Sequence, residues 1–406
     1  MKRLLALLTA MCFAVGYAVV FCVRAVDVSA EAAVLLCADT LDVLYERQAH
    51  TRLSMASTTK IMTALLTIEE YTPQRVVHVT APMVRVEGTS MGLLPGDSVS
   101  LYALSCGMLL SSGNDAANTA AVSISGSIEA FCIRMNARAQ EVGMTDTHFV
   151  TPSGLDDEAH YSTAYDMALL AAEAIRNPVF RSICSSHNIT VSYGNPPYRR
   201  TLTNHNRLLQ SFEGCVGVKT GFTRKSGRCL VSAAEREGVT LVAVTLNDPD
   251  DWRDHTAMLE YGFDCVRSVQ ADADLHGLAV PVVGSKRNSV SVRFAEQPFF
   301  VTAGEAAEPT RKVYIQPFLY APVHKGTVVG KAVYTLAGKA VCTADIVTAG
   351  GAAYFAPTQT ECVKKQDLFS KWTETVKGVW QAWHKRFGFK NSSPNAALPR
   401  GEKRRK

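Results

Sequence analysis

The spacing of apolar positions predicts a mixed domain over the first two thirds of the chain. Residues 33–37 and 43–45 are apolar runs separated by a short segment with two aspartates, which indicates an opening β-hairpin. Apolar residues three or four positions apart predict helices at Lys60 to Glu70, Leu101 to Leu110, Ser127 to Val142 and Tyr165 to Ile175. Strand patterns return at Gly214 to Thr220, Gly227 to Ala233 and Val239 to Leu246. Strands at both ends of a helical middle favour one α+β domain in which the hairpin joins the last strands.

A second pattern begins near Cys265. Short alternating segments such as 290–294 and 313–315 are separated by turn residues and predict a small all-β domain over residues 268–357. From Leu368 onward, apolar residues fall on one helical face: Leu368, Trp372, Val376, Val379, Trp380, Trp383 and Phe387. With basic residues mostly elsewhere, this predicts an amphipathic helix for a membrane interface. A helix docked on its own protein is the alternative.

The N-terminus has the order of a secretory signal. Lys2-Arg3 precedes an apolar run from Leu4 to Val23, and the small-residue site Val28-Ser29-Ala30 follows. This order predicts cleavage after Ala30. An uncleaved membrane anchor is the alternative, because the apolar run is long enough to span a bilayer. We therefore expect a signal over 1–30, the mixed domain over 31–267, the all-β domain over 268–357, and the amphipathic helix with a basic tail over 358–406.

Composition and charge exclude several classes of protein. The 406 residues are 47% hydrophobic and 19% charged, which is typical of a chain that buries a sizeable core. The net charge is +5, but residues 361–406 alone hold 12 lysines and arginines against 4 acidic residues. The basic character therefore belongs to the tail, and no nucleic-acid partner is expected.

The cysteines do not indicate a metal site. Two of the eleven, Cys12 and Cys22, lie in the predicted signal, and the other nine are scattered without a Cys-x-x-Cys pair. Nine is an odd number, so at least one thiol stays free or pairs between chains. We expect most of them to be buried thiols.

One short motif offers a nucleophile. Ser57-Thr58-Thr59-Lys60 is the only Ser-x-x-Lys in the chain, and it opens a helical pattern. Residues three apart on a helix share a face, so the Ser57 hydroxyl can meet the Lys60 amine. A neutral lysine can be the base that a serine nucleophile requires. By itself the motif is weak, since a serine near a helix start is more often a cap.

Two further motifs gain meaning from their order. Ser112-Gly113-Asn114 offers a second hydroxyl and a side-chain amide, although these are also ordinary turn residues. Lys219-Thr220-Gly221 lies in a strand pattern and can present a cation and a hydroxyl to a carboxylate. By itself it is equally typical of a surface strand with an exposed lysine.

Together the three motifs resemble the serine penicillin-binding protein and β-lactamase superfamily, in which they occur in this order. The surrounding sequence is similar to low-molecular-weight penicillin-binding proteins of the D-alanyl-D-alanine carboxypeptidase type. The segments that carry this resemblance are 56–64, 112–117, 147–149, 152–155 and 218–223. It covers residues 33–265 in detail and the rest in layout only. One departure is Thr40-Leu41-Asp42, where such a hairpin turn is expected to contain a glycine.

The resemblance implies a β-lactamase/transpeptidase-like catalytic domain and a role for each motif residue. Ser57 attacks the carbonyl between two terminal D-alanines, Lys60 accepts its proton and Ser112 relays it. The oxyanion is held by the amides of Ser57 and Phe222, the latter following Gly221. Lys219 and Thr220 bind the terminal carboxylate, and Asn114 aligns the peptide. No metal or cofactor is implied. The expected partners are peptidoglycan stem peptides, β-lactams as inhibitors, and the extracytoplasmic face of the bacterial cytoplasmic membrane.

Three other functions use the same fold. A β-lactamase needs a dedicated glutamate between the second and third motifs, and Glu158 and Glu173 lie there without a matching context. A D,D-endopeptidase shares the whole site, so the sequence does not separate it from a carboxypeptidase. A non-catalytic wall-binding protein has no evident need for the complete proton-transfer set.

Overall fold

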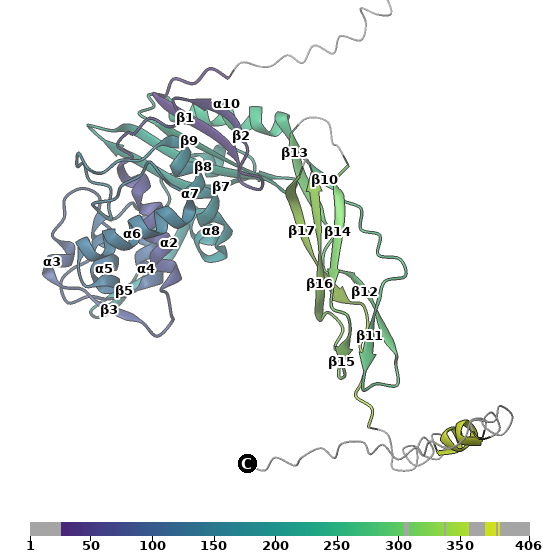
Figure 1. The fold of residues 1–406 in the computed structure, drawn as a ribbon. Coiled ribbons are helices and arrows are strands. Elements are labelled where there is room, and N and C mark those ends of the chain that lie inside the picture. Colours follow the sequence, from purple (N-terminus) through teal and green to yellow (C-terminus); the bar gives the residue numbers. More distant parts are fainter. Residues whose placement is uncertain (1–25, 304–307, 337, 357–369, 379–380, 382–406) are drawn as a thin grey trace, which may run out of the picture. The chain divides into compact units, whose positions relative to one another are not determined.

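This computed structural model describes residues 26–303, 308–336, 338–356, 370–378 and 381. The chain divides into two units (Figure 1). Unit 1 comprises Met1–Asp272, Pro298–Thr310 and Tyr334–Cys342, and unit 2 comprises Ala273–Gln297, Arg311–Val333 and Thr343–Lys406. Unit 1 therefore extends to Asp272 and includes two later stretches, whereas the sequence pattern predicts a single boundary after residue 267.

A five-stranded antiparallel sheet forms the centre of unit 1, in the order β2-β1-β9-β8-β7. Its strands are β1 (Ala32–Cys37), β2 (Val43–Arg47), β7 (Cys215–Thr223), β8 (Gly227–Arg236) and β9 (Val239–Leu246). The predicted hairpin is thus confirmed, and it joins the last strands through β9. Leu41 takes the left-handed conformation at the turn (φ 61°), which is the position where a glycine was expected.

β1 shows why this sheet is buried on both faces. All six of its residues have 0% exposure. Because strand side chains alternate, Val34 and Leu36 enter the core shared with the helical cluster, whereas Leu35 and Cys37 enter a second core with α10 (Asp251–Cys265). A strand that is apolar at every position therefore lies between two layers of helices.

The helical layer of unit 1 contains the Ser-x-x-Lys and Ser-Gly-Asn motifs. It contains η1 (Ala56–Thr59), α2 (Lys60–Glu69), α3 (Ala81–Val84), α4 (Leu101–Leu109), α5 (Asn114–Ser125), α6 (Ile128–Val142), α7 (Ala164–Arg176), α8 (Pro178–Cys184) and α9 (Leu208–Ser211). A four-stranded sheet, β3 (Val76–His78), β4 (Ser98–Ser100), β5 (Asn188–Gly194) and β6 (Pro197–Thr203), also belongs to this unit. The four predicted helices and the α+β class are confirmed.

The last strands of the chain form the predicted β-rich region. β10 (Val266–Gln270) pairs with β13 (Phe299–Ala303). A six-stranded sheet has the order β14-β16-β17-β12-β11-β15. Its strands are β11 (Ala279–Val283), β12 (Ser289–Phe294), β14 (Thr310–Ile315), β15 (Leu319–Tyr320), β16 (Val328–Leu336) and β17 (Lys339–Thr348).

The segment before β1 is part of the folded unit. Val28 and Ala30 are buried at 1% and 0% exposure, and the Ser29 hydroxyl donates to the Asp254 carboxylate at 2.7 Å. Against the effect of burial, the hydrogen bonds from Ser29 keep the pKa of Asp254 below its ordinary value. Residues 1–25 of the predicted signal lie outside the described residues.

The predicted C-terminal helix is described in part. Residues 370–378 are helical and include Trp372 and Val376, and the other residues of the predicted stripe lie outside the described residues. Among the helices that the structure describes, none combines the length and the apolarity needed to cross a bilayer. All eight cysteines within the described ranges are free thiols, and five of them are buried: Cys37, Cys106, Cys132, Cys184 and Cys229.

Candidate active site

Ser57 lies in a 3₁₀ turn rather than in the α-helix proper. The turn η1 covers Ala56–Thr59, and α2 begins directly after it at Lys60. A 3₁₀ turn has three residues per turn, so residues three apart are eclipsed and Ser57 lies in line with Lys60. Lys60 Nζ donates to Ser57 Oγ at 2.8 Å. No side-chain cap bond comes from Ser57, so the reading of this serine as a helix cap is wrong.

Lys60 is buried in surroundings that favour its neutral form. Its exposure is 0%, and Nζ donates to the backbone oxygen of Ser153 at 2.6 Å. Burial, reinforced by the nearby charge of Lys219, lowers the pKa of Lys60 well below its usual range. A neutral amine has a lone pair to receive a proton, which is what a general base beside a serine needs.

A buried histidine, His160, stabilises the 3₁₀ turn through hydrogen bonds. The backbone N–H of Val150 donates to His160 Nδ1 at 3.1 Å, so the proton of a neutral ring lies on Nε2. Nε2 then donates to Thr59 Oγ1 at 2.8 Å, and Thr59 Oγ1 donates to the Ala56 oxygen at 2.8 Å. Ala56 itself takes a strained left-handed conformation (φ 47°). His160 is therefore a positioning residue for the turn that presents Ser57.

The His160→Ala variant is expected to acylate with penicillin about tenfold more slowly, because Val150 N–H and the Thr59 hydroxyl lose their partner and the turn relaxes. His160→Asn, which keeps one acceptor and one donor, should recover part of that rate. Stopped-flow acylation well below the unfolding temperature measures both variants. An unchanged rate in a folded His160→Ala protein contradicts the positioning role.

The same histidine gives the wild type an acid limit. Burial lowers the pKa of His160 to about 4, below its usual 6.5. Between pH 6.5 and about 4, His160 is therefore protonated in the unfolded chain but neutral in the folded chain. The stability that this group contributes is complete above pH 6.5 and declines as the pH falls towards 4.

The second motif lies at the turn between α4 and α5. Ser112 is 6% exposed and takes a left-handed conformation (φ 59°), and its backbone oxygen accepts from Thr89 Oγ1 at 2.6 Å. Asn114 begins α5, and its Nδ2 donates to the Glu87 oxygen at 2.6 Å. Its Oδ1 is buried and has no hydrogen-bond partner among the described residues. A buried amide oxygen without a donor is one that a substrate N–H can satisfy.

Asp115 fixes the loop that faces this motif. Its carboxylate accepts from the Ser90 hydroxyl at 2.6 Å and from the backbone amides of Met91, Gly92 and Leu93 at 2.9 to 3.0 Å. On the other side of the loop, Tyr193 Oη donates to the Met91 oxygen at 2.6 Å. A loop held from both sides keeps Thr89 and Ser112 in fixed positions.

The third motif lies on the edge strand β7, which packs against η1. A Cβ added to Gly221 would lie 3.2 Å from the Ser57 nitrogen and 3.1 Å from the Met55 oxygen. Gly221 thus lets the strand approach the nucleophile's backbone closely. Lys219 is 1% exposed, and burial lowers its pKa to about 7. Phe222, one residue beyond Gly221, is 66% exposed.

The motifs meet at one cavity of about 520 Å³. Its wall contains Ser57, Ser112, Thr220, Gly221 and Phe222, together with Thr89, His205, Arg207, Arg228, Asp251 and Trp252. Lys60 reaches this wall through its bond to Ser57, whereas Lys219 and Asn114 are buried near it. Segments up to 195 residues apart, Ser57 and Trp252, thus share one cavity.

Several residues of the site carry no motif in the sequence. His160, Asp115 and the Ser153 carbonyl fall within segments that resemble the family or next to them, but nothing in the local pattern assigns them contacts. Arg228, Asp251 and Trp252 also line the cavity. The Arg228 guanidinium donates to Asp251 and lies 5.8 Å from the centre of the Trp252 ring. The only sequence feature that could have pointed to this part of the site is the cluster of charged residues at the start of α10, from Asp250 to Asp254.

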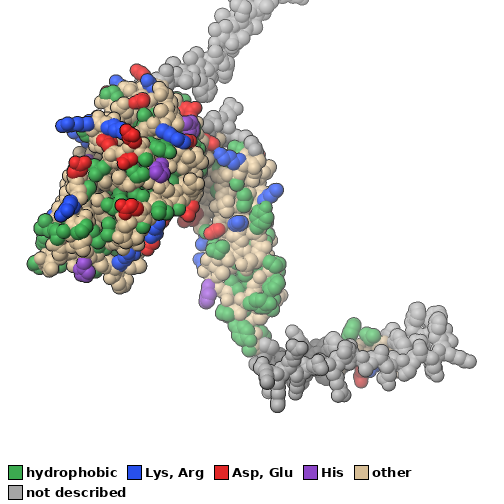
Figure 2. Space-filling view, turned by 60° about the vertical axis from the view of Figure 1, so that its left-hand side comes forward, with side chains coloured by type: hydrophobic (Ala, Val, Ile, Leu, Met, Phe, Trp, Pro, Cys, Tyr) green, Lys and Arg blue, Asp and Glu red, His purple; other side chains and the backbone are tan. Residues whose placement is uncertain are grey.

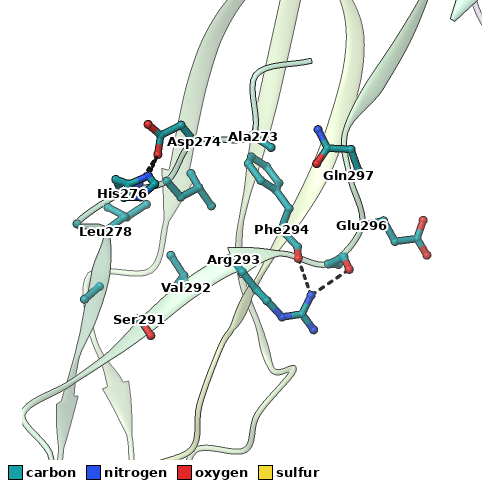
Figure 3. Close-up of a pocket in the computed structure, with 14 residues that line it drawn as sticks. Ala273, Asp274, His276, Leu278, Ser291, Val292, Arg293, Phe294, Glu296 and Gln297 are labelled. Atoms are coloured by element: carbon teal, nitrogen blue, oxygen red, sulfur yellow. Dashed lines mark hydrogen bonds and ion pairs between the residues drawn. The ribbon is translucent and has the colours of Figure 1, made fainter. Parts of the chain in front are cut away.

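A larger cavity, of about 620 Å³, lies in unit 2 between residues 273–279 and 291–297. Figure 3 shows that Asp274 lies beside His276 and that the Arg293 guanidinium lies beside two backbone oxygens. Asp274 pairs with His276, and Arg293 donates to the Phe294 and Ala295 oxygens at 2.8 and 3.2 Å. No serine–lysine pair lines this cavity, so the chemistry belongs to the smaller cavity in unit 1.

The chain is similar in sequence to proteins of known function. A family model described as D-alanyl-D-alanine carboxypeptidase matches residues 19–250, and one described as the C-terminal domain of penicillin-binding protein 5 matches residues 263–351. The D-alanyl-D-alanine carboxypeptidase DacF of Bacillus subtilis is 31% identical over 330 residues, which are 78% of this chain and 84% of DacF. DacC of Escherichia coli, also named a D-alanyl-D-alanine carboxypeptidase, is 31% identical over 340 residues, covering 79% and 83%.

A solved structure extends the likeness to both regions. The crystal structure of penicillin-binding protein 5 from Haemophilus influenzae matches with a TM-score of 0.58 at 28% identity, covering 80% of this chain and 98% of that one. The similarity therefore spans the mixed domain and the β-rich region after it.

Proposed function

This chain belongs to the D-alanyl-D-alanine carboxypeptidase family, and from that premise we propose that it removes the terminal D-alanine of peptidoglycan stem pentapeptides through an acyl-enzyme on Ser57. It is a serine-type peptidase and a penicillin-binding protein of that family. The observation that carries the proposal is the 2.8 Å bond between Ser57 Oγ and the buried, neutral-favouring amine of Lys60.

Acylation begins at this pair. Lys60 takes the Ser57 proton while Oγ attacks the carbonyl carbon between the two D-alanines. The negative charge that develops on the carbonyl oxygen is received by the backbone amides of Ser57 and Phe222. The close approach of Gly221 to the Ser57 nitrogen supports this assignment. Collapse of this intermediate breaks the amide bond. Ser112 passes the proton to the departing amine of D-alanine, and water later hydrolyses the ester to free Ser57.

Substrate binding uses the remaining motif residues. Lys219 and Thr220 bind the terminal carboxylate, because a cation and a hydroxyl are the groups that a carboxylate accepts from. Asn114 aligns the peptide, with its unpaired Oδ1 as the acceptor for a substrate N–H. A penicillin presents an amide and a carboxylate in the same relation, so it acylates Ser57 as an inhibitor.

The geometry disfavours a β-lactamase. Rapid deacylation requires a glutamate that can activate water beside the acyl-serine. Glu173 is bonded to Arg138 at 2.8 Å, Glu158 is exposed, and neither lines the cavity. A penicillin adduct that lasts minutes or longer supports this reading, whereas rapid turnover of penicillin contradicts it.

The direct test is D-alanine release from diacetyl-Lys-D-Ala-D-Ala by the purified enzyme. Release that stops after treatment with penicillin supports the carboxypeptidase. Tight peptide binding without release supports a non-catalytic wall-binding protein instead. Release only from cross-linked muropeptides, but not from this peptide, supports an endopeptidase.

We also propose that the exported enzyme stays at the extracytoplasmic face of the cytoplasmic membrane through its C-terminal helix. Peptidoglycan lies outside that membrane, so the enzyme acts outside the cytoplasm. In the described part of the helix, Trp372 and Val376 are 61% and 46% exposed and four residues apart, hence on one face. An exposed apolar face beside lysines suits an anionic lipid interface.

Signal cleavage is proposed to occur before Val28 rather than after Ala30. A cut after Ala30 removes Val28 and Ser29, and it leaves the buried carboxylates of Asp248 and Asp254 without the donors that Ser29 provides. Ala25 is the nearest small residue upstream. The intact mass of the exported protein should include residues 28–30. A mature chain that begins at Glu31 contradicts this prediction.

A further inference from the structure

One end of unit 2 exposes several large apolar side chains among the residues that the structure describes. Four large side chains define it, and we name it the β15 end: Val283, Phe318, Tyr320 and Tyr354, exposed by 50%, 45%, 71% and 65%. Hydrophobic side chains gather at this end of the unit in Figure 2. Clustered apolar side chains of this size on a soluble surface usually mark a contact with a partner or a membrane.

The backbone holds these side chains outward. β11 and β15 pair in parallel, with Val282 opposite Leu319 and Val283 opposite Tyr320. Val282 and Leu319 are both buried at 8% exposure, so alternation turns Val283 and Tyr320 to the solvent side. The Phe318 ring meets the Tyr320 ring edge to face, with 5.3 Å between their centres. The aromatic surface is therefore a fixed feature of the sheet end.

The described stretch that follows β17 ends at the same place in unit 2. The Phe355 amide donates to the Gly284 oxygen at 2.8 Å, and Val323 and Ala352 form a bridge. The last described residue of this stretch is Ala356. The segment proposed to associate with the membrane begins within about a dozen residues of it, at Leu368.

The charge around the β15 end has one sign. The three segments that form it, residues 281–289, 316–327 and 350–356, contain Lys286, Arg287 and Lys325 and no aspartate or glutamate. Lys286 Nζ lies 4.4 Å from the centre of the Phe355 ring. Aromatic side chains next to cations are the combination that binds the headgroup region of anionic bilayers.

We propose that the β15 end is a second membrane contact, which lies against the anionic lipid surface beside the C-terminal helix. The proposal rests on the membrane association proposed above, since the helix brings this end to the bilayer. Tyr320 and Phe318 enter the headgroup region, and the three cations face lipid phosphates. Two contacts on one chain add avidity without a new protein partner.

The test compares matched variants of the full chain. Tyr320→Ser removes a tyrosine from the β15 end, and Tyr314→Ser removes an exposed tyrosine from β14, the strand at the opposite edge of the same sheet. Lys325→Glu and Lys312→Glu form the equivalent charge pair. Binding is measured by co-sedimentation with vesicles of phosphatidylglycerol and phosphatidylcholine. The β15-end variants should bind at least threefold more weakly, while the β14 variants bind like the wild type.

Hydrogen exchange distinguishes membrane contact by the β15 end from membrane contact by the C-terminal helix alone. With vesicles, peptides covering 316–322 and 350–356 should exchange more slowly, as should those covering 368–388. Protection of 368–388 alone supports the helix and overturns the second contact. No binding to vesicles overturns both. Protection of 316–322 that appears without vesicles and depends on protein concentration indicates that a second copy of the chain covers this surface, which overturns the proposal. An equal loss of vesicle binding in Tyr320→Ser and Tyr314→Ser also overturns it.

Discussion

Ser57→Ala is expected to abolish D-alanine release, with kcat falling by about 10⁴-fold or more. The hydroxyl forms the covalent bond in the acyl-enzyme, and in the described chain no other serine hydroxyl receives a hydrogen bond from Lys60 Nζ, whose second partner is the backbone oxygen of Ser153. Covalent labelling by a fluorescent penicillin should disappear with it. Gel fluorescence and coupled D-alanine assays measure the two effects.

The control for this variant is substrate affinity. Ser57→Ala leaves Lys219, Thr220 and Asn114 in place, so the folded protein should still bind the peptide. Labelling that survives the change places the nucleophile elsewhere and contradicts the proposed mechanism.

Lys60→Met is expected to slow acylation by about 10²- to 10⁴-fold, the range that general-base catalysis supplies. Methionine fills a similar volume in this fully buried position, so the turn that carries Ser57 keeps its packing. The rate constant of penicillin acylation measures the loss directly. A thermal unfolding midpoint close to that of the wild type shows that the fold is retained.

The pH profile distinguishes a base from a packing residue. In the wild type, acylation should rise with pH as the proton leaves Lys60, whose pKa burial and Lys219 lower. Loss of the proton from Lys219 has the opposite effect on the rate. Burial lowers its pKa to about 7, so the free enzyme loses the cation for the substrate carboxylate above that pH, and kcat/KM falls. In Lys60→Met the rising limb should vanish while the falling limb remains. A rising limb that persists contradicts the role of Lys60 as the base.

Local patterns in the sequence predicted the opening hairpin, four helices of unit 1 and the strands β7, β8 and β9. α2 and α4 begin where their apolar spacing begins, and the opening hairpin pairs as expected with β9. α5 was not predicted as a helix, because its residues Asn114–Ser125 are mainly small and polar and offer little contrast between two faces. Its buried residues are four alanines and four polar residues, Asn114, Asp115, Asn118 and Thr119, so the hydrophobic signal of this helix is weak.

The order of the three motifs was sufficient to identify the family, but not the state of its side chains. A Ser-x-x-Lys spacing places the two residues on one face, yet it does not lower the pKa of the lysine. That shift requires burial and the charge of Lys219, which is 159 positions away. His160 likewise reaches Thr59 from 101 positions away.

The sequence by itself determined the opening hairpin, four helices, the strands β7, β8 and β9, and the residues that can do chemistry, because periodicity and motif spacing are properties of short segments. Only the tertiary structure decided that Ser57, Ser112 and Thr220 share a cavity, that the Lys60 side chain is fully buried, and that Ser29 belongs to the folded unit. Desolvation and proximity arise when distant segments pack together, and no local pattern records them.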